Sequence, residues 1–347
     1  MLPAAVLLSY FSLTIVLNLL GRYNRPGDDT YCASVLVAFQ ELLKFLVCIL
    51  ISLCNVGASN LRDAILSRQT ALFALPSIAF AVQKNLDLAS MKRLEIPIYL
   101  MVIETKSVLA ALWSRALLGR RFSWLQVVAL LVLAFGDALA VGAFDILAHH
   151  SRRREPSSST TPAVRDYEYV VGTLCGLLGT VLSSWASVYS ERLLKMPGSI
   201  WVRNVQFGCS AVPAALIVLA SGDLPWIAEH GLLQGFTPAV WLLGCLVSVI
   251  GMVMAACLKY VSAVAIGFVR ASTLVFLTLI SIPLFGFKPS ANFSIGGTLV
   301  VGSMALYAVS SHAEQKRAAS APDDAAVARQ LLPAEDSETQ GRVDPEG

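Results

Sequence analysis

The sequence predicts an all-α membrane protein in which the membrane-crossing helices form the fold itself. Of its 347 residues, 56% are hydrophobic and 14% are charged, whereas an ordinary soluble domain has about 25% charged residues. A helix needs about 20 apolar residues to cross a bilayer, and runs of this kind recur along most of the chain. The lipid bilayer is therefore the expected surroundings of the whole domain, not of one anchor.

Ten spans are expected. They cover residues 2–20, 31–54, 69–90, 96–117, 124–143, 169–190, 200–221, 236–257, 263–284 and 293–312. The first run has no basic leader and no small-residue cleavage site after it, so we expect a retained helix and not a signal peptide.

The spans group into two halves, residues 1–143 and 169–312. Between them, residues 144–168 are rich in Ser, Thr, Pro and Arg and predict a flexible loop. Residues 313–347 are polar and acidic and predict a disordered cytosolic tail.

An internal repeat relates the two halves. Residues 117–123 (LLGRRFS) precede the fifth span, and residues 284–290 (LFGFKPS) precede the tenth. Two five-helix halves of opposite orientation, the plan of many secondary transporters, would produce this repeat. Alternatively, a glycine followed by a cation simply ends a hydrophobic helix in both places.

Basic residues next to the spans predict that both termini face the cytosol. The loops on that side contain Arg62, Arg68, Arg115, Arg120, Arg121, Arg192, Lys195, Arg203, Lys259, Lys316 and Arg317. The triple arginine at 152–154 is the exception on the other side.

Composition and motifs argue against several other classes. The seven cysteines show no CxxC or Cys/His spacing, so neither a disulfide framework nor a metal site is indicated, and no cofactor is expected. The net charge of +3 and the absence of aromatics around the triple arginine argue against a nucleic-acid partner. No hydrolase, zincin or phosphate-loop motif occurs, so an enzyme is not expected.

Ionisable residues inside spans are costly and are candidates for function. Glu41 and Lys44 lie three residues apart on one helical face, where they could form an ion pair or a site. Lys84 lies near a span end, where a lysine can reach the membrane surface.

The fourth span combines an aromatic ring with a cation. Tyr99 precedes Lys106 by about two helical turns, so both side chains share a face. A ring that stacks on a base and a cation that meets a phosphate would then line one cavity, although Lys106 could instead pair with Glu104. Arg270 in the ninth span has no nearby acid in sequence and requires either a distant carboxylate or an anionic ligand.

Five segments match a pattern known from one family. They are 41–44 (ELLK), 81–86 (AVQKNL), 187–195 (SVYSERLLK), Trp201–Gln206 (WVRNVQ) and 284–287 (LFGF), of which Trp201–Gln206 is the most specific. With these segments the chain resembles, up to about residue 312, the Golgi nucleotide-sugar transporters, in the branch with the CMP-sialic acid, UDP-galactose and UDP-N-acetylglucosamine carriers. The resemblance implies ten helices in two inverted halves, cytosolic termini, a Golgi or alternatively endoplasmic reticulum membrane, and exchange of nucleotide sugar for nucleoside monophosphate.

The resemblance also suggests site residues. Tyr99 and Lys106 match the family's nucleotide-binding tyrosine and lysine, while its second tyrosine and second glutamine are Ile103 and Glu104 here. The remaining matches at nucleotide-contacting positions are Ser183, Asn204 and Asn85, and Glu41 and Lys44 would lie near the sugar.

One motif departs from the family. The family's Asp-Asn-x-x-Lys-Gly-Phe is SAVAIGF at residues 262–268, so Ile266 replaces the phosphate-site lysine. Arg270, one turn later, and Lys84 could supply the missing positive charge.

The expected function is therefore exchange of a nucleotide sugar, first of all a UDP-sugar, for a nucleoside monophosphate by alternating access. Two alternatives remain: a non-transporting scaffold or regulator of a paralogous carrier or glycosyltransferase, and a carrier of another organic anion. The expected partners are further copies of the chain in a homo-oligomer, or glycosyltransferases in a complex.

Overall fold

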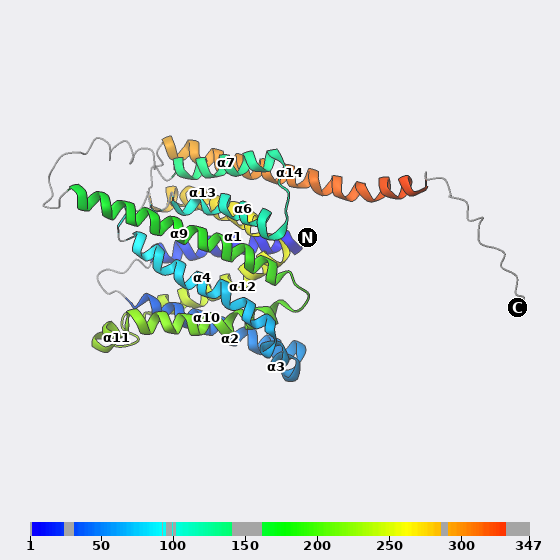
Figure 1. Cartoon of the computed structure of the whole chain (residues 1–347). Coiled ribbons are helices and arrows are strands. Elements are labelled where there is room, and N and C mark those ends of the chain that lie inside the picture. The colour runs from blue at the N-terminus through cyan, green and yellow to red at the C-terminus, as the bar shows by residue number, and fades with distance from the viewer. Residues whose placement is uncertain are drawn as a thin grey trace, which may run out of the picture.

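A computed structural model describes residues 2–23, 31–91, 93–94, 99, 102–140, 162–285 and 291–330. These residues form helices and no strands, as predicted, and most of the helices lie side by side in one bundle (Figure 1). The helices are α1 (Leu2–Tyr23), α2 (Ala33–Val56), α3 (Ala58–Leu66), α4 (Arg68–Met91), α6 (Lys106–Leu118), α7 (Trp124–Ala140), α9 (Pro162–Leu194), α10 (Ile200–Gly222), α11 (Leu224–His230), α12 (Pro238–Tyr260), α13 (Ala263–Phe285) and α14 (Ala291–Gln330).

Six helices are long and apolar enough to cross a membrane, or seven if the bent pair of α3 and α4 forms one span. The bend between α3 and α4 is 63°. Helix α7 and residues 263–277 of α13 are apolar but shorter, and the expected span 96–117 is described only at residue 99 and from residue 102 onward. The chain is therefore a multi-pass helical membrane protein, and the count of ten spans stays a prediction.

Two helices extend beyond their predicted spans. Helix α9 begins at Pro162, inside the expected loop, and α14 continues past residue 312 to Gln330, where it leaves the bundle (Figure 1). Hydropathy locates only the membrane-embedded part of a helix, and the alanine-rich sequence after residue 317 has high helix propensity. Residues 144–161 and 331–347 lie outside the described part of the chain, so a flexible loop and a disordered tail stay predictions.

Small residues allow close approach of the helix pair α4 and α9. A Cβ atom at Gly179 would lie 2.7 Å from Asp87 Oδ1, and one at Gly176 would lie 2.8 Å from Ser90 Oγ. Helices α7 and α14 approach in the same way at Gly296, where a Cβ would lie 2.5 Å from the Gly136 carbonyl oxygen. Close packing through small residues replaces the hydrophobic effect as the driving force between membrane helices.

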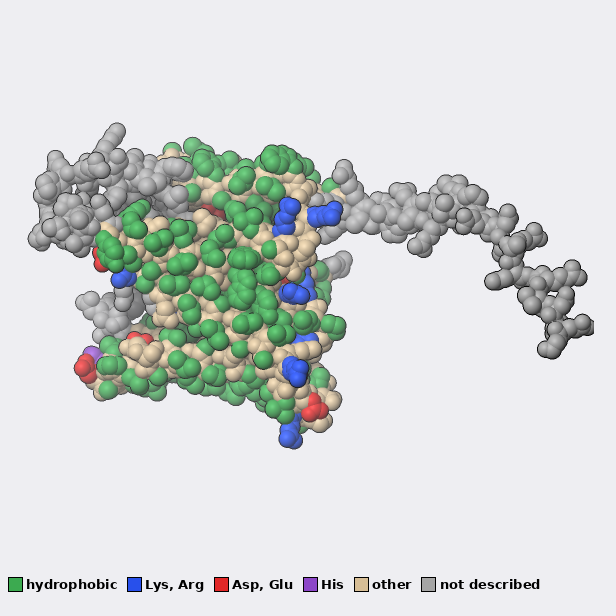
Figure 2. All heavy atoms as spheres, viewed as in Figure 1, with side chains coloured by type: hydrophobic (Ala, Val, Ile, Leu, Met, Phe, Trp, Pro, Cys, Tyr) green, Lys and Arg blue, Asp and Glu red, His purple; other side chains and the backbone are tan. Residues whose placement is uncertain are grey.

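Helices that are distant in the sequence pack against one another in the bundle. Helix α2 packs on α10, α4 on α9 and α10, α1 on α12 and α13, α6 on α9, α12 on α2, and α7 on α14. Figure 2 shows one face of this assembly, where hydrophobic side chains dominate between the two ends. Most of the visible Lys and Arg side chains gather at the end where the N-terminus lies and α14 emerges (Figures 1 and 2).

Candidate functional site

Ionisable side chains from separate helices meet inside the bundle around Lys106, the first residue of α6. The charges of Arg270, Asp87 and Glu104 all act on its ammonium group. Arg270 Nη2 lies 3.4 Å from Glu104 Oε2, which joins positions 166 residues apart in the chain. The structure thus brings together the two cations that the sequence analysis assigned to phosphate. Of the two alternatives for Arg270, a distant carboxylate or an anionic ligand, the structure shows a carboxylate, that of Glu104.

Asp137 in α7 belongs to the same group, and the sequence analysis missed it. Its side chain is fully buried, and its carboxyl group interacts with Glu104 and with the charge of Arg270. In the sequence it is the one acid within an apolar run and has no base at helical spacing. The rule that an ionisable group within a span is a candidate would have found it.

Tyr99 borders this group but is covered. Only 7% of it is exposed, and it packs with Leu94, Ile103 and Tyr169, while the charge of Asp87 acts on its hydroxyl. In this conformation little of the ring is free to stack on a base.

A second polar group lies between α1, α2 and α12. Lys44 Nζ forms an ion pair of 2.5 Å with Glu41, and both line a cavity of about 190 Å³ together with Tyr10 of α1 and residues of α12 such as Ser248. The ion pair, one of the two alternatives for these residues, is therefore observed, and their place near a sugar stays a prediction. The charge of Arg270 also acts on the Tyr10 hydroxyl. Because Tyr10 lines the cavity, the cavity lies near the group around Lys106.

Lys84 on α4 is exposed, and the charges of Glu41 and Lys44 reach it. The charges that act on Lys84 are therefore those of α2 and not those of the group around Lys106. Asn85 beside it is also exposed and donates to the Ala81 carbonyl at 3.0 Å.

Two further predicted contacts, Ser183 and Asn204, are buried and donate to carbonyls of their own helices. The distances are 3.3 Å to Thr180 O and 3.0 Å to Ile200 O, respectively. Among the described residues, no hydrogen bond or ion pair links Ser183, Asn204 or Asn85 to Lys106 or Arg270.

Ile266, which replaces the family lysine, lies in the main hydrophobic core. It is 4% exposed and belongs to the same cluster as Val264 and Phe268. This position therefore contributes packing, and the cation of α13 is Arg270, one turn further on.

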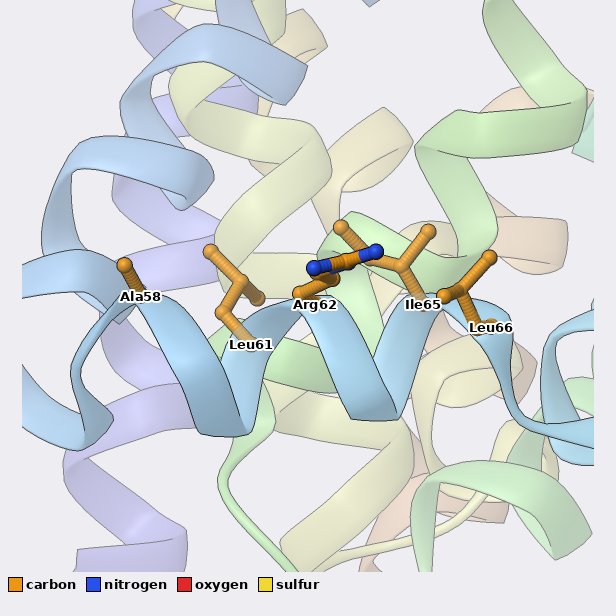
Figure 3. A pocket seen from close by; sticks show the side chains of 5 residues that line it. All are labelled: Ala58, Leu61, Arg62, Ile65 and Leu66. Carbon is orange, nitrogen blue, oxygen red and sulfur yellow. The ribbon is translucent and has the colours of Figure 1, made fainter.

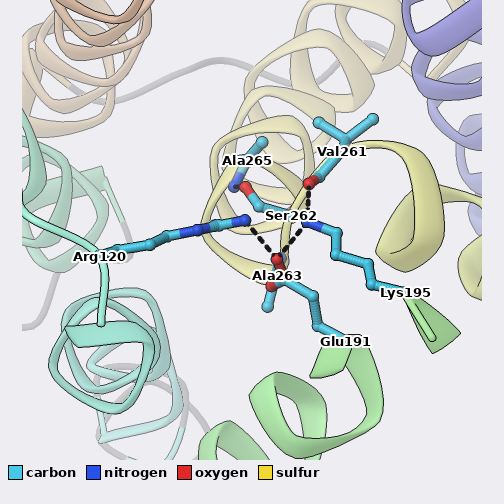
Figure 4. A network of polar contacts seen from close by, with 7 residues as sticks. All are labelled: Arg120, Glu191, Lys195, Val261, Ser262, Ala263 and Ala265. Carbon is cyan, nitrogen blue, oxygen red and sulfur yellow. Dashed lines mark hydrogen bonds and ion pairs between the residues drawn. The ribbon is translucent and has the colours of Figure 1, made fainter. Parts of the chain in front are cut away.

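Residues 187–195 (SVYSERLLK) have a structural role. Glu191 of α9 is fully buried and accepts from Arg120 Nη2 at 2.6 Å, Lys195 Nζ at 2.7 Å and the Ala263 amide at 2.8 Å. Lys195 also donates to the Val261 carbonyl at 2.8 Å (Figure 4). One carboxylate thus ties the end of α9 to the turn before α7 and to the start of α13.

The segment Trp201–Gln206 has a similar role. Arg203 donates to Gln69 at 2.6 Å, to Gln206 at 3.0 Å and to the Pro197 carbonyl at 2.8 Å, and Gln206 donates to Ala64 O at 2.8 Å. These bonds hold α10 against the bend between α3 and α4.

A shallow hollow of about 370 Å³ lies on α3, between Leu61, Ile65 and Leu66, with Arg62 lying across it (Figure 3). All of its lining residues come from this one helix. It is therefore a groove of the helix surface, separate from the interior charged groups.

The all-helical fold and the charges inside it define an integral membrane protein with a polar interior. Residues 3–308 match the family model described as nucleotide-sugar transporter. The chain therefore belongs to the nucleotide-sugar transporter family.

Three relatives are similar to this chain over most of its length. The chain is 29% identical over 319 residues to the UDP-galactose translocator of Mus musculus, covering 87% of this chain and 78% of that protein. It is 30% identical over 305 residues to the UDP-galactose/UDP-N-acetylglucosamine transporter srf-3 of Caenorhabditis elegans, covering 85% and 78%. It is 29% identical over 319 residues to the UDP-N-acetylglucosamine transporter of Rattus norvegicus, covering 86% and 95%. A solved structure, 18% identical, superposes with a TM-score of 0.63 over 88% of this chain and 95% of that one, which shows the fold alone.

Proposed function

We propose that this protein exchanges a cytosolic UDP-sugar for a lumenal nucleoside monophosphate across the Golgi membrane by alternating access. The observation that carries the proposal is the meeting of Lys106 and Arg270 inside the bundle of a nucleotide-sugar transporter family member. Two cations at one place suit a phosphate, which carries up to two negative charges. The UDP-sugar is favoured because the named relatives are transporters of UDP-galactose and UDP-N-acetylglucosamine.

Helix packing supports two halves of five spans, residues 1–143 and 169–312, related by a two-fold axis. The spans would be α1, α2, α3 with α4, α6 with the residues before it, and α7, followed by α9, α10, α12, α13 and α14. If each helix is replaced by its equivalent in the other half, the contact of α1 with α12 becomes that of α9 with α4. The contact of α1 with α13 becomes that of α9 with α6, and that of α4 with α10 becomes that of α12 with α2. The pairs α2 with α10 and α7 with α14 map onto themselves, as an inverted repeat requires.

The charge distribution supports cytosolic termini. The N-terminus and the emerging end of α14 lie at the end of the bundle where the visible Lys and Arg side chains gather (Figures 1 and 2). Positive charge marks the cytosolic side of membrane proteins.

Each group of site residues would bind a different part of the nucleotide sugar. Lys106 and Arg270 would bind phosphates, and Ser183, Asn204 and Asn85 would hydrogen-bond the nucleotide after releasing their helix carbonyls. Tyr99 would stack on the base once its cover of Leu94 and Tyr169 opens. Glu41, Lys44 and Lys84 would surround the sugar end.

The test is counterflow uptake into proteoliposomes preloaded in turn with UMP, CMP, GMP or AMP and offered the matching labelled nucleotide. We expect uptake with UMP, loss of uptake in Lys106→Ala, and unchanged uptake in Arg121→Ala, which removes an exposed arginine in the turn before α7. Lack of uptake with every nucleotide, from folded protein, would overturn the antiporter proposal. If Arg270→Ala leaves transport unchanged while Lys106→Ala abolishes it, the compensating role of Arg270 is wrong.

The second candidate is a non-transporting scaffold or regulator of a paralogous carrier or glycosyltransferase. Ile266 favours it, because the position of the family lysine is filled by a buried apolar side chain. Labelled-nucleotide binding separates the two, since a scaffold that has lost its site binds none. Competition by other organic anions would identify a carrier of a different ligand.

A further inference from the structure

We propose that Asp137 and Glu104 form a proton-binding site inside the helix bundle, and that proton uptake there favours binding of an anion at Lys106 and Arg270. The second half of this inference rests on the proposed function. The first half rests on the burial of Asp137, on its lack of a hydrogen-bond partner among the described residues and on its interaction with Glu104.

Asp137 is a buried acid without a donor. None of its surface is exposed, and among the described residues neither of its carboxylate oxygens has a hydrogen-bond partner. A buried carboxylate is costly when it is ionised and receives no hydrogen bond. A proton on this group removes the charge and supplies a donor at once.

The ionisable groups near Asp137 lie on the helices that pack against α7. Helix α7 packs on α14, α6 and α13. The residues at and before the start of α6 supply Glu104 and Lys106, and α13 supplies Arg270. From Ala291 to Ser311, α14 offers Tyr307 as its one ionisable side chain, and that ring stacks on Phe268. Tyr10 of α1 also lies within reach of the charge of Arg270.

Glu104 and Arg270 both act on Asp137, and Glu104 is the acid of the two. Its carboxyl interacts with that of Asp137, while its Oε2 atom faces Arg270 at 3.4 Å. Two adjacent carboxyl groups resist ionising together, and one proton between them makes a hydrogen bond. Asp137 would then donate that bond to Glu104, and Glu104 would keep its charge for Arg270.

A metal ion fits this place less well than a proton. Among the described residues no group of three His, Cys, Asp or Glu side chains could hold a metal. The two acids also stand beside two cations, which would repel a metal ion. A proton needs only the two interacting carboxyl groups.

The sign of the coupling follows from charge. When Asp137 is protonated, Glu104 is the one negative group of this carboxyl pair beside Arg270, and a phosphate can approach both cations. When Asp137 loses its proton, a second carboxylate repels the phosphate. Anion affinity should therefore be higher at low pH and should fall as pH rises, by up to about tenfold per pH unit for one linked proton.

The first experiment needs no ligand. Infrared spectra of the purified full-length protein should show the carbonyl stretch of a protonated, buried carboxyl group at about pH 7. This band should vanish in Asp137→Asn and persist in Asp63→Asn, which changes an exposed acid on α3. If Asp137→Asn does not fold, Asp137→Glu keeps a carboxyl group and should shift the band. Absence of the band from the wild type, or a band unchanged in a folded Asp137 variant, would overturn the proton site.

The second experiment measures UMP binding between about pH 6 and about pH 8. Wild type should lose affinity with rising pH more steeply than Asp137→Asn, and the variant should match the wild type at low pH. The phosphate of UMP titrates in this range as well, but it contributes equally to both proteins, so the difference isolates the carboxyl pair. Parallel curves would overturn the coupling. Absence of UMP binding in wild type together with the infrared band would count against the proposed function and leave the proton site in place.

Discussion

Replacing Glu191 by glutamine should destabilise the protein more than any single substitution of its partners. The carboxylate is fully buried and accepts three hydrogen bonds, from Arg120, Lys195 and the Ala263 amide. A glutamine keeps the volume, but its one amide oxygen can replace only part of this set. Its NH₂ group would also face donors.

The size of the effect follows from these bonds. Hydrogen bonds to charged groups contribute about 1.5–3 kcal/mol each, and a buried amide left without an acceptor costs about 1–3 kcal/mol. Arg120 and Lys195 retain 32% and 30% of their side-chain exposure, so water recovers part of the loss. We therefore expect Glu191→Gln to lower the free energy of unfolding by about 3 kcal/mol.

Equilibrium unfolding in mixed detergent and SDS micelles measures this difference. Arg120→Ala should cost only about 1 kcal/mol, because Glu191 keeps Lys195 and the Ala263 amide. Arg121→Ala is the matched control, since this neighbouring arginine is exposed, and it should change stability by less than about 0.5 kcal/mol. A Glu191→Gln protein as stable as wild type, or less affected than Arg120→Ala, would refute the reasoning.

Two further predictions concern helix packing. Gly296→Val should lower stability by about 1–3 kcal/mol, because a Cβ would meet the Gly136 carbonyl at 2.5 Å, whereas Gly302→Val should be tolerated because nothing lies within 4 Å of that Cβ. Thermal unfolding in detergent compares the two, and equal melting temperatures would contradict the contact. Arg203→Lys should cost about 2 kcal/mol, because an ammonium cannot reproduce the planar fork that contacts two glutamine amides and a backbone carbonyl. Arg192→Lys, at an exposed position, is its control in the same assay.

Local physical rules predicted much of this structure from the sequence. Hydropathy located the six helices that are long and apolar enough to cross a membrane, because membrane burial depends on composition over about 20 residues. Helical spacing predicted that Glu41 and Lys44 could form an ion pair, since residues three apart share one face of a helix. Depth within a span singled out Lys106, which the structure places among other charges.

Pairings between distant helices could not be derived in this way. The contact of Arg270 with Glu104 joins residues 166 positions apart, and only the packing of α13 beside α6 makes it. The rule for ionisable groups within spans would have marked Asp137 as a candidate, but the sequence does not name Glu104 and Arg270 as its neighbours. The same limit applies to Glu191, whose partners lie on the turns before α7 and α13.

The geometry of Arg270 allows its structural and ligand-binding roles to be separated. Its distance of 3.4 Å to Glu104 exceeds the range of about 2.7–2.9 Å for a strong charge-assisted bond. The Arg270 side chain is also 33% exposed, and its guanidinium has five N–H donors. One loose contact with Glu104 therefore leaves most of these donors for a phosphate.

If Arg270 serves the phosphate, Arg270→Gln should weaken UMP binding by roughly 10- to 100-fold, the loss of about 1.5–3 kcal/mol from a charge-assisted contact. Its stability should change by less than about 1 kcal/mol, because the Glu104 pair is long and partly hydrated. Arg270→Lys should recover part of the binding through its charge, although it loses the fork. Isothermal titration with UMP and unfolding in micelles measure the two effects. A large loss of stability with unchanged UMP binding would mean that Arg270 only neutralises Glu104, and the cation that replaces the family lysine would then have to be sought on another helix.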